Sequence, residues 1–124
     1  MGALEDRFRA VCLKLWGEQE GEDTFQWIRA SRPPHFHSLA MQVMTPIWES
    51  DRLDLRTRIL CCIAIFTALN RSEVKFFMKM AAHHQIPREE VEEVLLLTGL
   101  EAGFPTAEMA VQLLMSAYST HGKD

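Results

Sequence analysis

The longest apolar run in the chain, ILCCIAIFTAL, extends from Ile59 to Leu69 and would place hydrophobic side chains around nearly the whole circumference of a helix. It has eleven residues, whereas a helix that crosses a bilayer needs roughly 20. We therefore expect a core helix buried among other helices, and no membrane-spanning segment. The N-terminal residues also lack the basic and apolar regions of a secretory signal.

Apolar residues elsewhere recur three or four positions apart, which is the spacing of one helix face, and no segment alternates convincingly as a half-buried strand would. One such stripe follows Phe36, and Pro46 within it is expected to kink or restart the helix. The polar stretch GEQEGEDT, residues 17–24, is predicted to be a loop. The stripe after Phe36 consists of Leu39, Ala40, Val43, Met44, Ile47 and Trp48.

Four helices are predicted in the second half of the chain. The apolar run belongs to the first, residues 55–69, and Ser72 can cap the second, which ends near residue 85. Pro87 suits the first turn of the third helix, and the fourth extends over residues 106–121. Together with the helices of the first half, the pattern predicts an all-α bundle of six or seven helices.

The chain has 124 residues, of which 48% are hydrophobic. This length and content fit one domain, residues 1–124, and so short a chain leaves apolar faces that favour oligomerisation. Thirteen basic against seventeen acidic side chains give a net charge of −4, which argues against nucleic acid as a partner. Three cysteines, an odd number, fit buried thiols in a reducing compartment better than a disulfide framework. We expect a soluble cytoplasmic protein.

The segment EVKFFMKMAAHHQIPREEVEEV contains an adjacent histidine pair, His83 and His84. Neighbouring helical side chains point about 100° apart, and no acidic residue stands three or four positions before the pair, so we expect no metal site. Three other roles stay open. The pair can end a helix, where a cation suits the negative end of the helix dipole. His84 can act as an acid or base at the rim of an apolar pocket, or the pair can contact another subunit.

Five short motifs lie between Phe36 and Leu114: IW before a short loop, LDLRTR, ALNR, PREEVEEVLLLTG and AGFPTAEMA. In this order they resemble the carboxymuconolactone decarboxylase family, a branch of the alkylhydroperoxidase-D-like fold. The resemblance implies an all-helical subunit of that fold. It also implies assembly into homotrimers or homohexamers, with pockets for a small-molecule substrate at or near subunit contacts.

Three features of the family are missing. Its thiol-dependent members carry C-x-x-C and a histidine on the helix that begins here near Arg71, but this chain has no cysteine after Cys62. A dithiol peroxidase is therefore excluded, because no resolving pair exists. The glutamate of these members falls on Ile59, and the histidine of the decarboxylases falls on Phe77, whose phenyl ring carries no proton.

Loss of CO₂ from a carboxylated lactone leaves a carbanion. An enzyme then needs a cation that orients the acid, dipoles for the enolate and a proton donor, but no cofactor. The resemblance places family arginines at Arg58 and Arg71, although either can instead form a structural ion pair, and His84 is the candidate proton donor. The expected pocket wall, whose members can equally be core or interface, consists of Met44, Trp48, Phe77 and Met78.

Two functions are consistent with these residues. The first is a cofactor-independent decarboxylase, or a related lyase, isomerase or cyclase, that acts on a small carboxylated or enolisable, largely apolar compound in specialised metabolism. The second is a catalytically silent binding or assembly subunit that keeps only the fold, because both the family histidine and the dithiol are missing. Fold alone does not decide between them.

Overall fold

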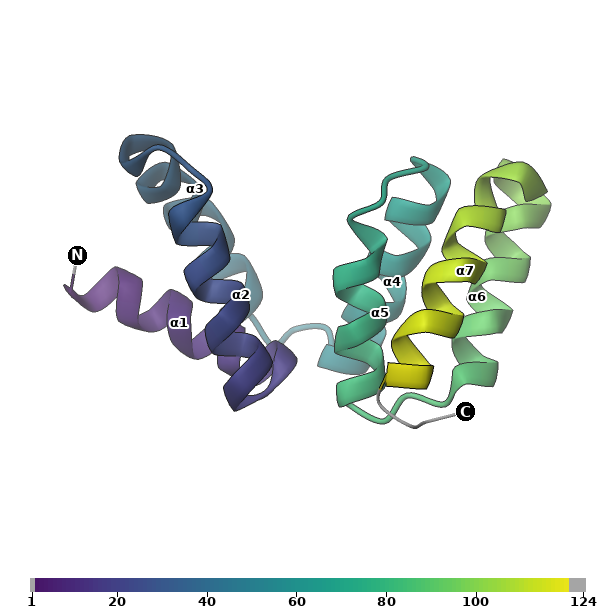
Figure 1. Cartoon of the computed structure of the whole chain (residues 1–124), viewed down its shortest axis with the longest axis horizontal. Helices are drawn as coiled ribbons and strands as arrows, with labels where there is room; N and C mark the ends of the chain where they lie inside the picture. Colours follow the sequence, from purple (N-terminus) through teal and green to yellow (C-terminus); the bar gives the residue numbers. More distant parts are fainter. Residues whose placement is uncertain (1, 121–124) are drawn as a thin grey trace. The chain divides into compact units, whose positions relative to one another are not determined.

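The computed structural model describes residues 2–120, which form seven helices and no strand (Figure 1). The all-α class is confirmed, and the number of helices lies within the predicted range. The chain divides into two compact units, residues 1–52 (unit 1) and 53–124 (unit 2), which are described separately. A single domain over residues 1–124 stays a prediction. Within the described range, every helix is too short or too polar to cross a membrane.

Unit 1 contains α1 (Gly2–Trp16), α2 (Glu18–Ala30) and α3 (Pro34–Glu49). α1 packs against both of the other helices, because its buried side chains recur with helical spacing along one face. The centre of the unit is a cluster of the buried residues Phe8, Cys12, Phe25 and Met41, with Leu4, Trp16, Ile28 and Met44 packed around it.

The predicted loop over residues 17–24 is wrong, because α2 begins at Glu18 and only Gly17 separates it from the end of α1 at Trp16. Gly17 turns the chain by itself with a φ of 93°, a conformation that glycine adopts without steric cost. The acidic residues that follow lie in the first turn of α2, where the positive end of the helix dipole stabilises them. Gly21 does not interrupt the helix. It allows a close approach to α1, since a Cβ there would lie 2.5 Å from the Cys12 carbonyl oxygen.

α3 continues through Pro46 to Glu49, so the predicted restart of a helix at this proline is wrong. A proline inside a helix removes the hydrogen bond to the carbonyl four residues earlier, here that of Gln42. Pro46 and Gln42 are both exposed, and water can therefore satisfy this carbonyl. The cost is small enough for the helix to continue.

Unit 2 contains α4 (Leu55–Ala68), α5 (Val74–His83), α6 (Arg88–Ala102) and α7 (Phe104–Thr120). Consecutive helices run in opposite directions (Figure 1). α4 and α7 each pack against both α5 and α6. The predicted bounds of α4 and α5 and the predicted starts of α6 and α7 agree with the structure to within two residues, but the apolar pattern breaks at Gly99 whereas α6 continues to Ala102. The predicted C-terminal residue of α7, His121, lies outside the described residues.

Two predicted helix starts differ in detail from the structure. Glu73, rather than Ser72, occupies the N-cap position of α5, and its side chain makes no capping hydrogen bond. Pro87 is the N-cap residue of α6, which begins one residue later, at Arg88.

The apolar run forms α4, but only part of its circumference is buried in unit 2. Ile59, Ile63 and Thr67 face the core of the unit. Ile65, on another face, is 54% exposed. The core is completed by buried residues of the other three helices, among them Val74, Met78, Met80, Ala81, Val91, Leu95, Ala110, Leu114 and Tyr118.

Candidate functional site

Arg58 and His84 lie at the same end of unit 2. Arg58 is in the first turn of α4, and His84 directly follows the last residue of α5. α4 and α5 are antiparallel neighbours, so the start of α4 lies beside the end of α5 (Figure 1). Both side chains are half-buried. The structure therefore places one candidate cation and one candidate proton donor at the same end of the α4–α5 pair.

Two backbone hydrogen bonds at the C-terminal end of α5 fix the conformation of the chain beside His84. The Gln85 N–H donates to the Ala82 carbonyl at 3.1 Å, and the Ile86 N–H donates to the Ala81 carbonyl at 3.0 Å. Gln85 has a φ of 60°, so this is a Schellman-type end with glutamine where glycine is usual. The prediction that the histidine pair ends a helix is confirmed, because His83 is the last residue of α5 and His84 its C-cap.

Tyr118 fixes this turn from α7. Its buried hydroxyl donates a hydrogen bond of 2.5 Å to the carbonyl oxygen of Ile86. Burial, followed by the charge of Glu89, raises the pKa of Tyr118 to about 12, so the hydroxyl stays a donor at neutral pH. The imidazole of His84 meets the ring of His83 nearly edge-on, with the ring centres 4.9 Å apart.

Arg58, at the start of α4, influences the pKa of the nearby Cys62 thiol. Burial is the largest effect on Cys62 and raises its pKa, the charge of Cys61 adds to the rise, and Arg58 opposes it. A raised pKa leaves less thiolate, which is the nucleophilic form.

Phe77 occupies an aromatic contact between α4 and α5. Its ring stacks on that of Phe66 with 5.1 Å between the centres and an angle of 25° between the planes. Both side chains are half-buried. Where the resemblance places the histidine of the decarboxylases, this chain therefore has an apolar ring pair.

The other predicted residues lie in three different places: the loop before α5, the core of unit 2, and α3 of unit 1. Arg71 is exposed in the loop before α5, and the ten residues of this helix span about 15 Å. Arg71 and His84 therefore lie near opposite ends of α5. Met78 is fully buried, so its contact with a substrate would require neighbouring side chains to move. Met44 and Trp48 are half-buried residues of α3, in unit 1.

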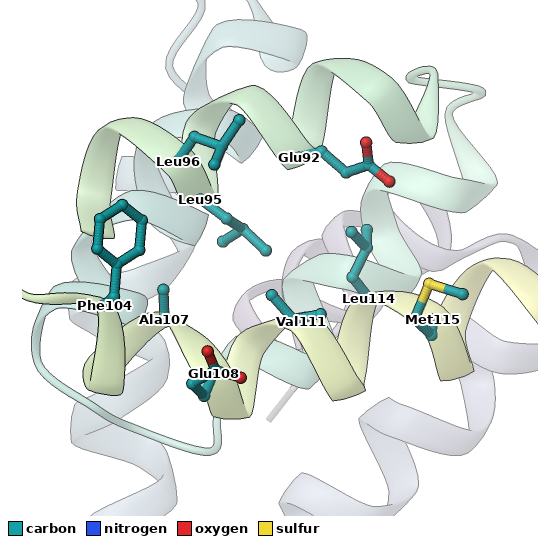
Figure 2. Close-up of a pocket in the computed structure, with 9 residues that line it drawn as sticks. All are labelled: Glu92, Leu95, Leu96, Phe104, Ala107, Glu108, Val111, Leu114 and Met115. Atoms are coloured by element: carbon teal, nitrogen blue, oxygen red, sulfur yellow. The ribbon is translucent and has the colours of Figure 1, made fainter. Parts of the chain in front are cut away.

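A groove of about 320 Å³ lies elsewhere in unit 2, between α6 and α7 (Figure 2). None of the seven predicted site residues lines it. A signal for it exists in the sequence, because the run of apolar residues 94–97 is wider than a single inward stripe and leaves Leu96 exposed. The lining residues are Glu92, Leu95, Leu96, Phe104, Ala107, Glu108, Val111, Leu114 and Met115.

Across the described residues, no group of three or more His, Cys, Asp or Glu side chains is arranged to hold a metal ion.

The model of the carboxymuconolactone decarboxylase family matches residues 34–115, about two thirds of the chain. The chain belongs to the carboxymuconolactone decarboxylase family. The match begins at α3 and ends in α7, so it includes Arg58, Phe77 and His84. Comparisons with curated proteins and with solved structures gave no match. The resemblance seen in the five motifs is thus confirmed at the level of the family.

Proposed function

We propose that this chain is a cofactor-independent decarboxylase, or a related lyase, isomerase or cyclase, of the carboxymuconolactone decarboxylase type. Its substrate is a small, largely apolar compound with a carboxylate or an enolisable carbonyl, in a specialised pathway of the cytoplasm. The observation that carries the proposal is that Arg58 and His84 both lie at the same end of the α4–α5 pair, in a chain of this family.

The proposed reaction needs only the groups that these residues supply. Arg58 pairs with the substrate carboxylate and orients it. The bond between the carboxylate carbon and the ring breaks, CO₂ leaves, and the electron pair moves into the adjacent unsaturated carbonyl as an enolate. The His84 imidazolium donates a proton to carbon as the carbonyl re-forms.

The first test follows γ-carboxymuconolactone with the purified protein in D₂O by NMR. We expect loss of the carboxylate signal and deuterium at a single carbon. Arg58→Ala and His84→Ala should each lower turnover at least 100-fold, the size of a lost acid–base or electrostatic contribution, with unchanged circular dichroism. His83→Ala is the matched control, because it alters the same helix end and leaves the proposed donor in place.

Arg71→Ala tests at which end of α5 the active site lies. If this variant loses turnover and Arg58→Ala does not, the active site lies at the other end and the assignment to His84 fails. Full turnover in both Arg58→Ala and His84→Ala would also refute the assignment.

A specific observation supports a second candidate, a catalytically silent binding or assembly subunit. Phe77 stacks on Phe66 at the position of the decarboxylase histidine, so the usual proton carrier of the family is absent. A silent subunit predicts that the Arg58 and His84 variants change only stability or ligand affinity. Any ligand that the protein converts chemically would refute it.

We further propose that the chain assembles with itself, as a homotrimer or homohexamer. Large apolar side chains that are about half exposed or more support this, since a soluble monomer rarely leaves many of them together. They are Ile65 of α4, Leu69 directly after it, and Leu97 and Leu100 of α6.

A further inference from the structure

The groove between α6 and α7 has no part in the proposed reaction. Its floor is apolar: Leu95 of α6 points toward Val111 and Leu114 of α7 (Figure 2). Its volume of about 320 Å³ lies at the lower end of the range for small-molecule sites. The groove therefore has room for one ring system or a short branched chain.

Phe104 forms a wall of the groove because α6 has a glycine opposite it. A Cβ at Gly99 would lie 2.5 Å from the Phe104 ring, so only the missing side chain lets the ring lie so close to α6. The ring is 52% exposed. It offers an aromatic surface on which a flat ligand or a cation can rest.

The charged residues of the groove are all acidic. Glu92 lies near Leu114 and Met115, and Glu108 lies next to Ala107 (Figure 2). Among the residues that the structure describes, no basic side chain lines the groove. Glu92 forms an ion pair with Arg88, with 3.5 Å between the Arg88 Nε and the Glu92 Oε2, so its negative charge is partly balanced. Glu108 is exposed and forms no ion pair within the described part of the chain.

We propose that this groove binds a small organic cation, namely a primary ammonium group carried on an apolar ring or chain. The apolar part lies between Leu95, Val111 and Phe104, the ammonium group faces Glu108, and Glu92 adds negative charge farther along the groove. A carboxylated compound, the substrate class of the proposed function, would be repelled by both carboxylates. The groove is thus a second site with the opposite charge preference.

A second copy of this chain fits the groove less well. The buried centres of protein interfaces are depleted in charged residues, and a copy seated here would have to cover Glu92 and Glu108. Leu97 and Leu100 are 56% and 67% exposed on α6 and do not line the groove. They offer an apolar surface for assembly outside it.

The test uses three probes with the same naphthalene ring: 2-(1-naphthyl)ethylammonium, 2-(1-naphthyl)ethanol and 1-naphthylacetate. The full-length protein carries ¹³C-methyl methionine, and Met115→Leu assigns the methyl signal of the groove. At low salt and pH 7 we expect the ammonium probe to shift the Met115 signal saturably. Its affinity should exceed that of the anion by roughly 10-fold or more, because each exposed carboxylate contributes up to about 1 kcal/mol, or 5-fold.

Single-residue variants then locate the charge preference. Glu108→Gln and Glu92→Gln should each weaken binding of the ammonium probe about 2- to 5-fold and strengthen binding of the anion. Glu93→Gln is the matched control, because Glu93 is the exposed neighbour of Glu92 on α6 and does not line the groove. It should change neither affinity.

Three results would overturn the proposal. In the first, the three probes bind equally or leave the Met115 signal unmoved. In the second, Glu93→Gln acts as strongly as Glu92→Gln, so that only net charge matters. In the third, Val111→Arg reduces the sedimentation mass of the protein, and the Met115 signal shifts with protein concentration in the absence of probe. A second copy would then occupy the groove. None of these results bears on the Arg58 and His84 variants, since neither residue lines the groove.

Discussion

Tyr118 is the only tyrosine in the chain, so its ionisation can be followed without interference. Burial, followed by the charge of Glu89, raises its pKa to about 12, from the ordinary value near 10. We predict that absorbance at 295 nm titrates near pH 12 in the folded protein and near pH 10 in denaturant. A midpoint near 10 in the folded protein would mean that the hydroxyl is exposed and does not bond to Ile86.

The same shift predicts how stability depends on pH. Below pH 10 both states keep the proton and the full contribution is present. Between pH 10 and 12 the unfolded state loses it first, so stability falls by up to about 1.4 kcal/mol per pH unit. Cys12, whose pKa burial raises to about 12, acts in the same direction. The free energy of unfolding of Tyr118→Phe, measured with urea, should therefore fall less between pH 10 and 12 than that of wild type. At pH 7 the variant should be less stable by about 1–3 kcal/mol, because the Ile86 carbonyl loses its donor.

Gln85 is a residue in a conformation that favours glycine. Its φ of 60° is strained for a side chain with a Cβ, so we predict that Gln85→Gly stabilises the protein by about 0.5–1 kcal/mol. The control is Gln112→Gly, because Gln112 is exposed within α7 and glycine there should cost about 1 kcal/mol. Equal effects of the two variants in chemical denaturation would contradict this account of the turn.

These residues show what the sequence can and cannot predict about the site. The end of a helix at His83–His84 follows from local pattern, because the apolar stripe stops there and Pro87 follows. The bond from Tyr118 to Ile86 joins residues 32 positions apart, and no local pattern records it. The position of Arg58 beside His84 likewise depends on the antiparallel packing of α4 and α5, which a stripe of apolar residues does not specify.

At the scale of the element, the two buried glycines should respond differently to alanine. A Cβ at Gly21 would lie 2.5 Å from a backbone oxygen and 2.7 Å from the Cα of Leu13 in α1, and a backbone cannot rotate aside. We predict that Gly21→Ala destabilises the protein by about 1–3 kcal/mol. This outweighs the roughly 1 kcal/mol that alanine contributes as a better helix former.

Gly99→Ala is the comparison, since the atoms that a Cβ would meet there belong to the half-exposed ring of Phe104. The ring can rotate into solvent, so we expect a change within about 1 kcal/mol in either direction. Thermal or chemical unfolding of the two variants checks both values. If Gly21→Ala is neutral, α1 and α2 do not approach as closely as the structure shows.

The failure of the loop prediction for residues 17–24 has the same origin. Polar composition and two glycines are typical of a loop, but Gly21 serves a close helix contact and its acidic neighbours suit a helix start. Only the position of α1 distinguishes these roles. In contrast, the bounds of α4 and α5 and the starts of α6 and α7 were predictable to within two residues, because their apolar positions recur with clear helical spacing.

At the scale of the whole molecule, the composition predicts apolar faces but not their position. The apolar run from Ile59 does not by itself indicate which side of the helix faces the core, because nearly all of its residues are hydrophobic. The structure shows which side is exposed. Along α4 and its C-cap, Cys61, Ile65 and Leu69 are exposed, while Ile59 and Ile63 are buried. This exposed side is the place where a test of self-assembly is most direct.

We predict that the wild-type chain sediments at three or six times its own mass and that Ile65→Lys lowers this mass. An isoleucine buried between subunits contributes about 1.5–3 kcal/mol, and a buried, unpaired ammonium group costs more than that gain. Gln112→Lys adds the same charge at an exposed polar position of α7 and should leave the mass unchanged. Both variants should keep the helical circular dichroism of wild type, since neither side chain is buried. A monomeric wild type would contradict self-assembly. If instead Ile65→Lys keeps the full mass, the assembly uses another apolar face, and Leu100→Lys on α6 is the next variant to compare.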